Sequence, residues 1–129
     1  MFPPVDRSID AAEASALRAQ LQGDLLLPGD AGYDDARAIW NGMIDRRPGL
    51  IIRCRNAGDV AAGVNFAREK GLPLAIKGGG HNVAGNAVCD DGVVLDLSPM
   101  RSVDVDPLSR TVRADGGCLL SDLDEATQE

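Results

Sequence analysis

The sequence has few aromatic residues, with one Trp, one Tyr and two Phe among 129 residues. A core must therefore be built from Leu, Ile, Val and Ala, and at this length it fits one domain or a piece of a larger one. Long apolar runs are also missing, since the stretch "LLLP" is far too short to span a bilayer. The N-terminal "MFPPVDRSID" lacks the apolar region of a signal peptide and carries early Asp residues. We therefore expect a cytoplasmic protein that does not associate with a membrane.

Basic residues are outnumbered, with 13 Lys and Arg against 20 Asp and Glu, which gives a net charge of −7. The basic residues are dispersed, and no lysine-rich patch is present. An acidic surface repels phosphodiester backbones. Nucleic acid is therefore excluded as an expected partner.

Cysteine pairs are absent, because Cys54, Cys89 and Cys118 form no C-x-x-C spacing and their number is odd. This pattern argues against a disulfide framework. With His81, the only histidine, the three thiols would formally supply four zinc ligands, but the spacing of a zinc knuckle is missing. We expect inert thiols and no metal.

The first predicted element is a helix over residues 9–23. Asp10 and Glu13 have the spacing of a capping box, and Gly23 is the expected stop. The stretch that follows, residues 24–49, contains the breakers "PGD" and "RRPG" and is predicted to be rich in loops.

A strand, a helix and a second strand are predicted next. The strands are 50–55 and 72–77; the helix between them has Asn56 as N-cap, Asp59 in its first turn and Gly71 at its end. Such a βαβ unit of about 30 residues implies parallel pairing of its two strands and a right-handed crossover.

The last third of the chain predicts a strand at 92–98, a hairpin made of 102–106 and 110–116, and a helix in "LLSDLDEATQE" that runs to Glu129. The predicted fold class is α+β, with a small parallel βαβ layer followed by an antiparallel hairpin.

The stretch "KGGGHN" places the single histidine directly after three glycines that follow a predicted strand. Glycines permit positive φ and close approach of a ligand to the backbone, and consecutive N–H groups form a concave anion site. The loop is not G-x-G-x-x-G, because position 83 is Val83, and it is not a P-loop, because Lys77 precedes the glycines. From glycine content alone, a glycine-rich turn with a solvated histidine is an equal alternative, and a histidine hydrogen-bonded in a turn is a lesser one. No catalytic triad is indicated, although three candidate side chains lie near in sequence: Asp96, Ser98 and Ser102.

Several motifs occur in order along residues 33–129: "Trp40-Asn41", "Pro48", "Asn56-x-x-Asp59-Val60", "Gly78-Gly79-Gly80-His81-Asn82", "Asp96-Leu97-Ser98-x-Met100" and "Gly116-Gly117". This stretch resembles the N-terminal part of FAD-linked oxidases with the PCMH-type (vanillyl-alcohol-oxidase-like) FAD-binding fold, in the berberine-bridge-enzyme-like branch. The resemblance implies two regions, an N-terminal helix and loop (1–32) and an incomplete FAD-binding domain (33–129).

The cofactor that the resemblance implies is FAD, with its pyrophosphate wrapped by the glycine-rich loop. The implied cofactor-binding residues are Lys77, Gly78, Gly79, Gly80, His81, Asn82, Gly85 and Gly117. The histidine matching His81 commonly carries a covalent bond to the flavin 8α-methyl group. A second linkage is not assigned, because Cys118 lies too early in the chain and Cys89 lies in the wrong segment.

The implied activity is that of an oxidoreductase, an oxidase that takes a hydride from a C–H bond of a small-molecule substrate and passes electrons to dioxygen. The family continues past Glu129, so the catalytic base is expected outside this sequence. The alternative is a non-catalytic half-domain that serves as an assembly or ligand-binding module. An incomplete domain exposes sheet edges and apolar surface, so we expect a homo-oligomer.

Overall fold

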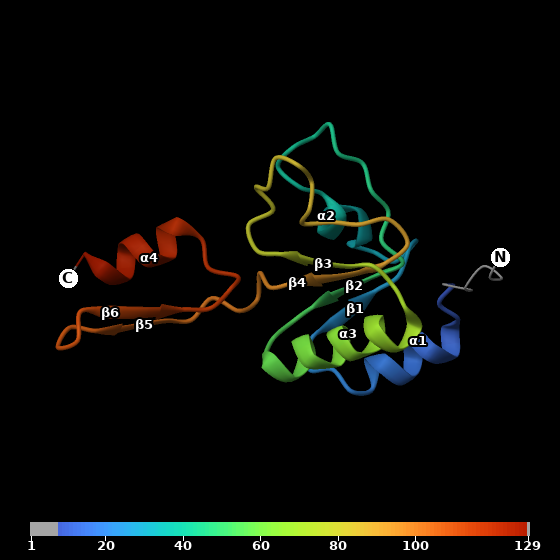
Figure 1. Cartoon of the computed structure of the whole chain (residues 1–129), viewed down its shortest axis with the longest axis horizontal. Helices are drawn as coiled ribbons and strands as arrows, with labels where there is room; N and C mark the ends of the chain where they lie inside the picture. The colour runs from blue at the N-terminus through green and yellow to red at the C-terminus, as the bar shows by residue number, and fades with distance from the viewer. Residues whose placement is uncertain (1–7, 129) are drawn as a thin grey trace.

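The computed structural model describes residues 8–128. A four-stranded sheet forms the centre, with strand order β1 (Asp24–Leu26), β2 (Leu50–Arg53), β4 (Val93–Asp96) and β3 (Leu74–Lys77). β2, β4 and β3 are parallel, and β1 is antiparallel to β2. Helices α1 (Ala11–Arg18) and α3 (Ala57–Lys70) lie together on one face of the sheet, and the short α2 (Tyr33–Arg37) lies on the other (Figure 1). A separate hairpin, β5 (Val103–Asp106) and β6 (Thr111–Ala114), is followed by α4 (Leu120–Thr127).

The predicted α+β class, with a parallel layer and an antiparallel hairpin, is confirmed. The prediction that the strands on either side of α3 pair directly with each other is wrong, because β4 lies between β2 and β3 and pairs with both in parallel. The apolar strand β4 is buried at all four positions, as expected of a central strand. Because β4 lies between β2 and β3, it pairs with two strands, whereas a strand at the edge of the sheet pairs with one.

The capping residues of the helices act as predicted. Asp10 Oδ1 accepts the Glu13 N–H at 2.8 Å, and Asn56 Oδ1 accepts the Asp59 N–H at 2.8 Å. Gly71 ends α3 with a φ of 64°, a conformation that favours glycine.

The first helix, in contrast, ends at Arg18 and not at Gly23. The amides of Gln22 and Gly23 are bound by the buried carboxylate of Asp59, at 2.8 and 2.9 Å. A tertiary contact thus holds the chain in a turn where local propensity favoured helix.

The stretch predicted as rich in loops contains two further elements, β1 and α2. Leu25 of β1 is buried in the same cluster as Leu17 of α1 and Leu50 of β2. Tyr33 of α2 is buried on the opposite face, and its hydroxyl donates to the Pro48 carbonyl oxygen at 2.6 Å. The proposed division between residues 32 and 33 stays a prediction.

Alternating side chains of the strands form two cores, one on each face of the sheet. Leu50 and Ile52 of β2 and Leu95 of β4 pack toward α3, whereas Ile51 and Val94 pack toward α2. Burying each of these side chains contributes about 1.5–3 kcal/mol. The sheet is therefore the rigid part of the molecule, and it fixes where its strand ends lie.

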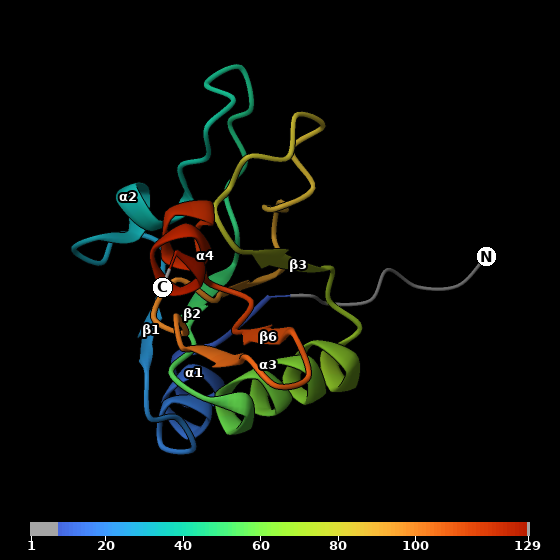
Figure 2. The same ribbon diagram turned by 90° about the vertical axis from the view of Figure 1, so that its left-hand side faces the viewer.

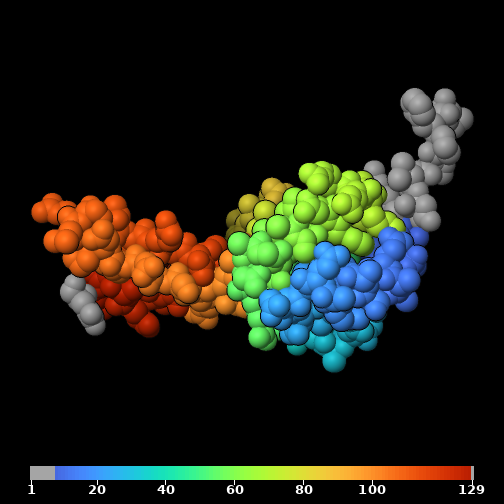
Figure 3. Space-filling view, turned by 90° about the horizontal axis from the view of Figure 1, so that it is seen from below, coloured from blue at the N-terminus to red at the C-terminus, as the bar shows by residue number. Residues whose placement is uncertain are grey.

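The hairpin and α4 extend from the sheet as an arm (Figures 1 and 3). All four residues of β6 are exposed, and no residue of α4 is buried. Two hydrogen bonds from Arg101 to the Asp122 carboxylate, at 3.0 and 2.6 Å, connect α4 to the start of the hairpin. Val105, Val112 and Leu120 keep large exposed areas on this arm.

Candidate functional site

A row of three charged residues lies at the carboxyl ends of the parallel strands. Arg53 is the register partner of Asp96, and Asp96 is the register partner of Lys77. Asp96 is buried, and its Oδ2 lies 3.7 Å from the Arg53 Nε atom. In open sheets with parallel strands, this edge is where ligands bind.

Two hollows meet at this row. One has a volume of about 300 Å³ and is lined by Gly32, Asp35, Ala36, Arg53, Lys77, Asp96 and Ser98. The second has a volume of about 370 Å³ and is lined by Asp24, Arg53, Arg55, Ser98, Pro99 and Arg101. A larger hollow of about 410 Å³ lies between α1 and α3, on the helical face, away from the strand ends. We place the site at the strand ends, because charged residues from three adjacent parallel strands meet there, as is typical of ligand sites in such sheets.

Lys77 is the residue of this row that the sequence predicted. Its ammonium group donates to the carbonyl oxygens of Ala36 and Ala38, at 2.9 and 2.7 Å. Burial lowers the pKa of the Lys77 ammonium group, and nearby Arg53 lowers it further, while Asp96 acts in the opposite direction. The two hydrogen bonds of the ammonium group fix the segment after α2 to the end of β3.

The glycines after Lys77 lie close to a segment that is distant in sequence. A Cβ added at Gly78 would lie 2.9 Å from the Gly116 carbonyl oxygen, and one added at Gly79 would lie 3.5 Å from a methyl carbon of Leu119. Gly80 has a φ of 74°. The structure thus brings the predicted glycine run against the second predicted glycine segment, with Gly78 next to the Gly116 carbonyl oxygen.

The imidazole of His81 is exposed and stands beside the indole of Trp40, with a ring-centroid distance of 5.9 Å and an interplanar angle of 31°. Within residues 8–128, neither ring nitrogen of His81 makes a hydrogen bond. The alternative of a histidine held by a hydrogen bond is therefore not what this structure contains, whereas a solvated histidine in a glycine-rich turn is compatible with it. Both nitrogens are available to react.

The remaining predicted residues occupy different roles. Asn82 accepts the N–H groups of Gly85 and Asn86, at 3.1 and 3.2 Å, so it shapes the loop. Gly117 donates its N–H to the Met100 carbonyl oxygen at 3.0 Å, and a Cβ there would lie 1.7 Å from the Leu97 carbonyl oxygen. Both Gly85 and Gly117 use their amides internally, so neither amide is free for a ligand.

The cysteines and His81 do not gather. No group of three or more His, Cys, Asp or Glu side chains that could hold a metal ion occurs among the described residues. Burial raises the pKa of the Cys54 thiol to about 12, and burial also raises the pKa of the Cys89 thiol. Such thiols are poor nucleophiles.

Sequence reasoning did not include Arg53, Arg55 and Arg101 among the candidate site residues. A signal was present for Arg53, because a charged residue ends each of the stretches "LIIR", "LAIK" and "VVLD". The carboxyl ends of parallel strands share one edge of a sheet, so Arg53, Lys77 and Asp96 meet there.

Comparison with known proteins identifies the fold and its cofactor class. A family model described as an FAD binding domain matches residues 48–129. The (R)-6-hydroxynicotine oxidase of Paenarthrobacter nicotinovorans is 43% identical over 103 residues, which cover 80% of this chain and 22% of the relative. An FAD-linked oxidoreductase of Dictyostelium discoideum is 39% identical over 110 residues, covering 84% of this chain and 24% of the relative.

Solved structures agree. The crystal structure of 6-hydroxy-D-nicotine oxidase from Arthrobacter nicotinovorans matches with a TM-score of 0.79 and 42% identity, over 82% of this chain and 23% of that one. A berberine-bridge-enzyme-like protein of Physcomitrella patens matches with a TM-score of 0.70 at 20% identity, over 77% of this chain and 22% of that one, and so supports the fold alone.

The fold is thus that of PCMH-type FAD-binding oxidases, and the chain belongs to the FAD-binding-domain family of FAD-linked oxidoreductases. It spans less than a quarter of the length of the relatives named above. Its cofactor is FAD. No helix among the described residues is long and apolar enough to cross a membrane.

The residues at the strand ends fit this cofactor. In the part of the chain that the structure describes, the amides of Gly79, Gly80 and His81 donate no hydrogen bond. Successive backbone amides that have no internal partner suit the oxygens of a diphosphate. Arg53 places a positive charge at the same edge.

Proposed function

We propose that this chain is the part of an FAD-linked oxidase that holds the FAD diphosphate and carries the flavin through His81. The observation that supports this proposal most is the glycine run at the carboxyl edge of a parallel sheet, ending in an exposed imidazole free of hydrogen bonds. The matched family supplies the cofactor class.

In this proposal the amides of Gly79 and Gly80 bind diphosphate oxygens, and Arg53 offsets their charge. Asn82 holds the loop in shape through the hydrogen bonds described above, and Lys77 fixes the segment after α2 to the end of β3. Gly78 lets the Gly116 carbonyl oxygen approach the loop closely.

His81 would hold the flavin covalently, through a bond from one ring nitrogen to the carbon of the 8α-methyl group. One hydrogen of that methyl group and the N–H hydrogen of the imidazole would be lost, and dioxygen would take them up with two electrons as hydrogen peroxide. Bound FAD would supply the two-electron acceptor for this oxidation, and His81 would supply the nucleophilic nitrogen.

When bound, FAD supplies the ability to accept a hydride from a C–H bond of a small-molecule substrate and to pass two electrons to dioxygen. The relative most similar among those named above is called an oxidase, which favours dioxygen as the acceptor. The chain spans less than a quarter of the length of the relatives named above, and we assign none of its residues to substrate binding or to the catalytic base.

The test is flavin retention. The chain is incubated with FAD under air and precipitated with acid, and flavin is measured in the pellet by its absorbance. We expect flavin in the wild-type pellet and none in the His81→Ala pellet, with hydrogen peroxide formed only by the wild type. Flavin that survives precipitation in His81→Ala refutes the linkage. A colourless, stable oligomer with no FAD uptake would favour a non-catalytic assembly module instead.

Self-association in the cytoplasm is part of the same proposal. The hairpin arm carries exposed Val105, Val112 and Leu120, and β3 forms an edge of the main sheet with exposed Leu74 and Ile76. Edges and apolar faces of this kind recruit a second chain, and a symmetric dimer is the expected closed form. Light scattering that gives a strict monomer at micromolar and higher concentration would contradict this part.

A further inference from the structure

A second segment of the chain lies along the glycine-rich loop. We call residues 39–47 the clamp segment and residues 78–88 the glycine loop; they run side by side at the top of the molecule (Figures 1 and 2). The Trp40 N–H donates to the Gly80 carbonyl oxygen at 3.0 Å, and Asn41 Nδ2 donates to the Val83 carbonyl oxygen at 2.9 Å. These two hydrogen bonds flank His81 and Asn82 on either side.

The contact continues beyond the histidine. Arg46 Nη1 donates to the carbonyl oxygens of Gly85 and Val88, at 2.9 and 3.1 Å. A Cβ added at Gly85, whose φ is 79°, would lie 2.9 Å from a methyl carbon of Ile44. The clamp segment therefore packs on bare backbone, and it supplies tertiary hydrogen bonds to a loop that contains no helix or strand.

Trp40 makes both kinds of contact at once. Its amide is bound to the residue before His81, and its indole lies beside the imidazole. Trp40 is nevertheless 66% exposed, so core packing does not account for its position. One residue thus binds the backbone next to His81 and places its own ring beside the imidazole.

The beginning of the clamp segment is itself held in place. The ammonium group of Lys77 binds the carbonyl oxygens of Ala36 and Ala38, just before Ile39. The Ile39 side chain lies 3.6 Å from where a Cβ of Gly80 would stand. The segment precedes residue 48, where the FAD-binding-domain match begins.

We propose that Trp40 is a positioning residue for His81: its indole selects the rotamer that presents the imidazole to the flavin, and the clamp segment fixes the backbone beneath it. The role toward flavin rests on the proposed function above. The restriction of the histidine side chain is a property of the chain without cofactor.

The chain contains one histidine and one tryptophan, so both rings give unambiguous NMR signals. The first measurement uses the cofactor-free chain. We expect nuclear Overhauser contacts between the indole and imidazole protons, and three-bond couplings of His81 that report a single χ1 rotamer. Trp40→Leu should average these couplings, and Trp40→Phe, which keeps an aromatic face, should restore the single rotamer.

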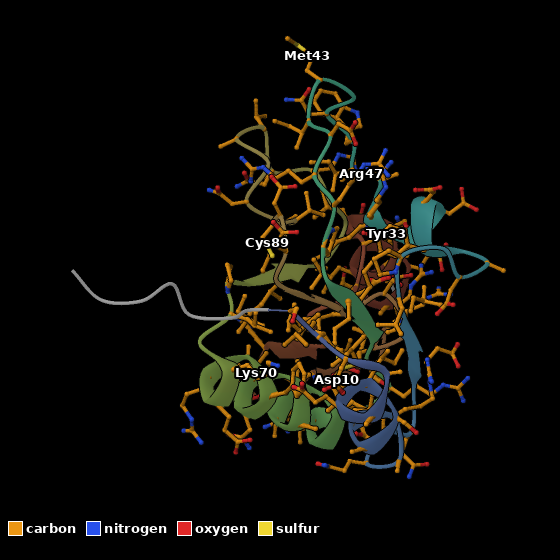
Figure 4. The ribbon with its side chains drawn as sticks, turned by 90° about the vertical axis from the view of Figure 1, so that its right-hand side faces the viewer. Asp10, Tyr33, Met43, Arg47, Lys70 and Cys89 are labelled. Carbon is orange, nitrogen blue, oxygen red and sulfur yellow. The ribbon has the colours of Figure 1, made fainter. Side chains whose placement is uncertain are left out.

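Met43→Leu is the matched control. Met43 belongs to the same segment, is 92% exposed and points outward from the tip of the loop (Figure 4). Its backbone N–H, which donates to Asn41 Oδ1, is kept in the variant. The control should retain the wild-type couplings. Far-UV circular dichroism checks that each variant is folded. If Trp40→Leu does not fold, Trp40→Phe supplies a second test.

The second measurement adds FAD and follows the amount of acid-stable flavin with time. Misplaced reacting atoms slow a reaction by up to about 100-fold, so we expect Trp40→Leu to attach flavin 10- to 100-fold more slowly, on the order of that loss. Trp40→Phe and Met43→Leu should attach it at nearly the wild-type rate.

The two measurements separate the inference from the proposed function. Averaged couplings in the wild type, or couplings unchanged in Trp40→Leu, overturn the positioning role whatever FAD does. If no variant takes up flavin but the couplings behave as expected, the proposed flavin linkage fails and the clamp on His81 stands.

Discussion

Replacing Asp59 by Asn should destabilise the fold by about 3 kcal/mol. The buried carboxylate accepts three amides: Oδ1 binds Gln22 at 2.8 Å, and Oδ2 binds Gly23 at 2.9 Å and Arg55 at 3.0 Å. An asparagine oxygen in the place of Oδ2 keeps two of these bonds, now without charge. Its NH₂ group then faces the Gln22 N–H, and a buried donor left unsatisfied costs about 1–3 kcal/mol, to which the weakening of two charge-assisted bonds adds.

Urea unfolding followed by circular dichroism measures this loss. Asp104→Asn is the control, because it removes one negative charge from an exposed position on β5 and should change stability by less than about 0.5 kcal/mol. A loss below about 1 kcal/mol for Asp59→Asn would refute the argument that these three bonds hold the turn after α1 to the start of α3.

The same contacts make a pH prediction. Burial by itself would raise the pKa of the Asp59 carboxyl, but the amides of Arg55, Gln22 and Gly23 outweigh burial and lower it. A carboxyl with a lowered folded-state pKa stabilises the fold above its unfolded value, near pH 4, and loses that contribution as the pH falls through the folded value. The difference between wild type and Asp59→Asn should therefore shrink between pH 7 and pH 3. A difference that stays constant or grows would contradict this assignment.

Three further outcomes are expected. Gly117→Ala should cost about 3 kcal/mol in urea unfolding, because its Cβ would lie 1.7 Å from the Leu97 carbonyl oxygen, whereas Gly42→Ala, with open space around it, should be nearly neutral. Cys54, which is buried and has a pKa of about 12, should resist iodoacetamide at pH 8 in the folded chain and react after unfolding; modification at the rate of Cys118 would show that the core opens readily. Asp122→Asn should weaken the Arg101 contact and increase hydrogen exchange in α4 while leaving β4 unaffected. Equal exchange of α4 in the wild type and in Asp122→Asn would mean that this ion pair does not order the arm.

Local features of the sequence were predictable, and contacts between distant segments were not. Asn56, Asp59 and Gly71 mark the ends of α3 because caps depend on neighbouring residues only. The place of β4 between β2 and β3 could not be read in the same way, because any apolar strand is compatible with a central or a flanking position. The end of α1 was missed for a related reason, since the carboxylate that binds Gly23 lies 36 residues away.

The same distinction between local features and contacts of distant segments holds for the site. The glycine run and His81 were visible as a motif, and the motif led to FAD. Trp40 and His81 are 41 positions apart in the sequence, so no local pattern encodes their contact. Arg53 joins the site only because parallel strands place their carboxyl ends together.

The central claim is that the glycine run binds FAD, and amide NMR tests it most directly. Unlabelled FAD is added to ¹⁵N-labelled chain, and the shift of each backbone amide is followed. The largest changes should fall on Gly79, Gly80 and His81, with smaller changes at Arg53 and Ser98, and ADP should reproduce those of the diphosphate site. Shifts confined to the hollow between α1 and α3, or no shifts at FAD concentrations that saturate flavoproteins, would contradict the account.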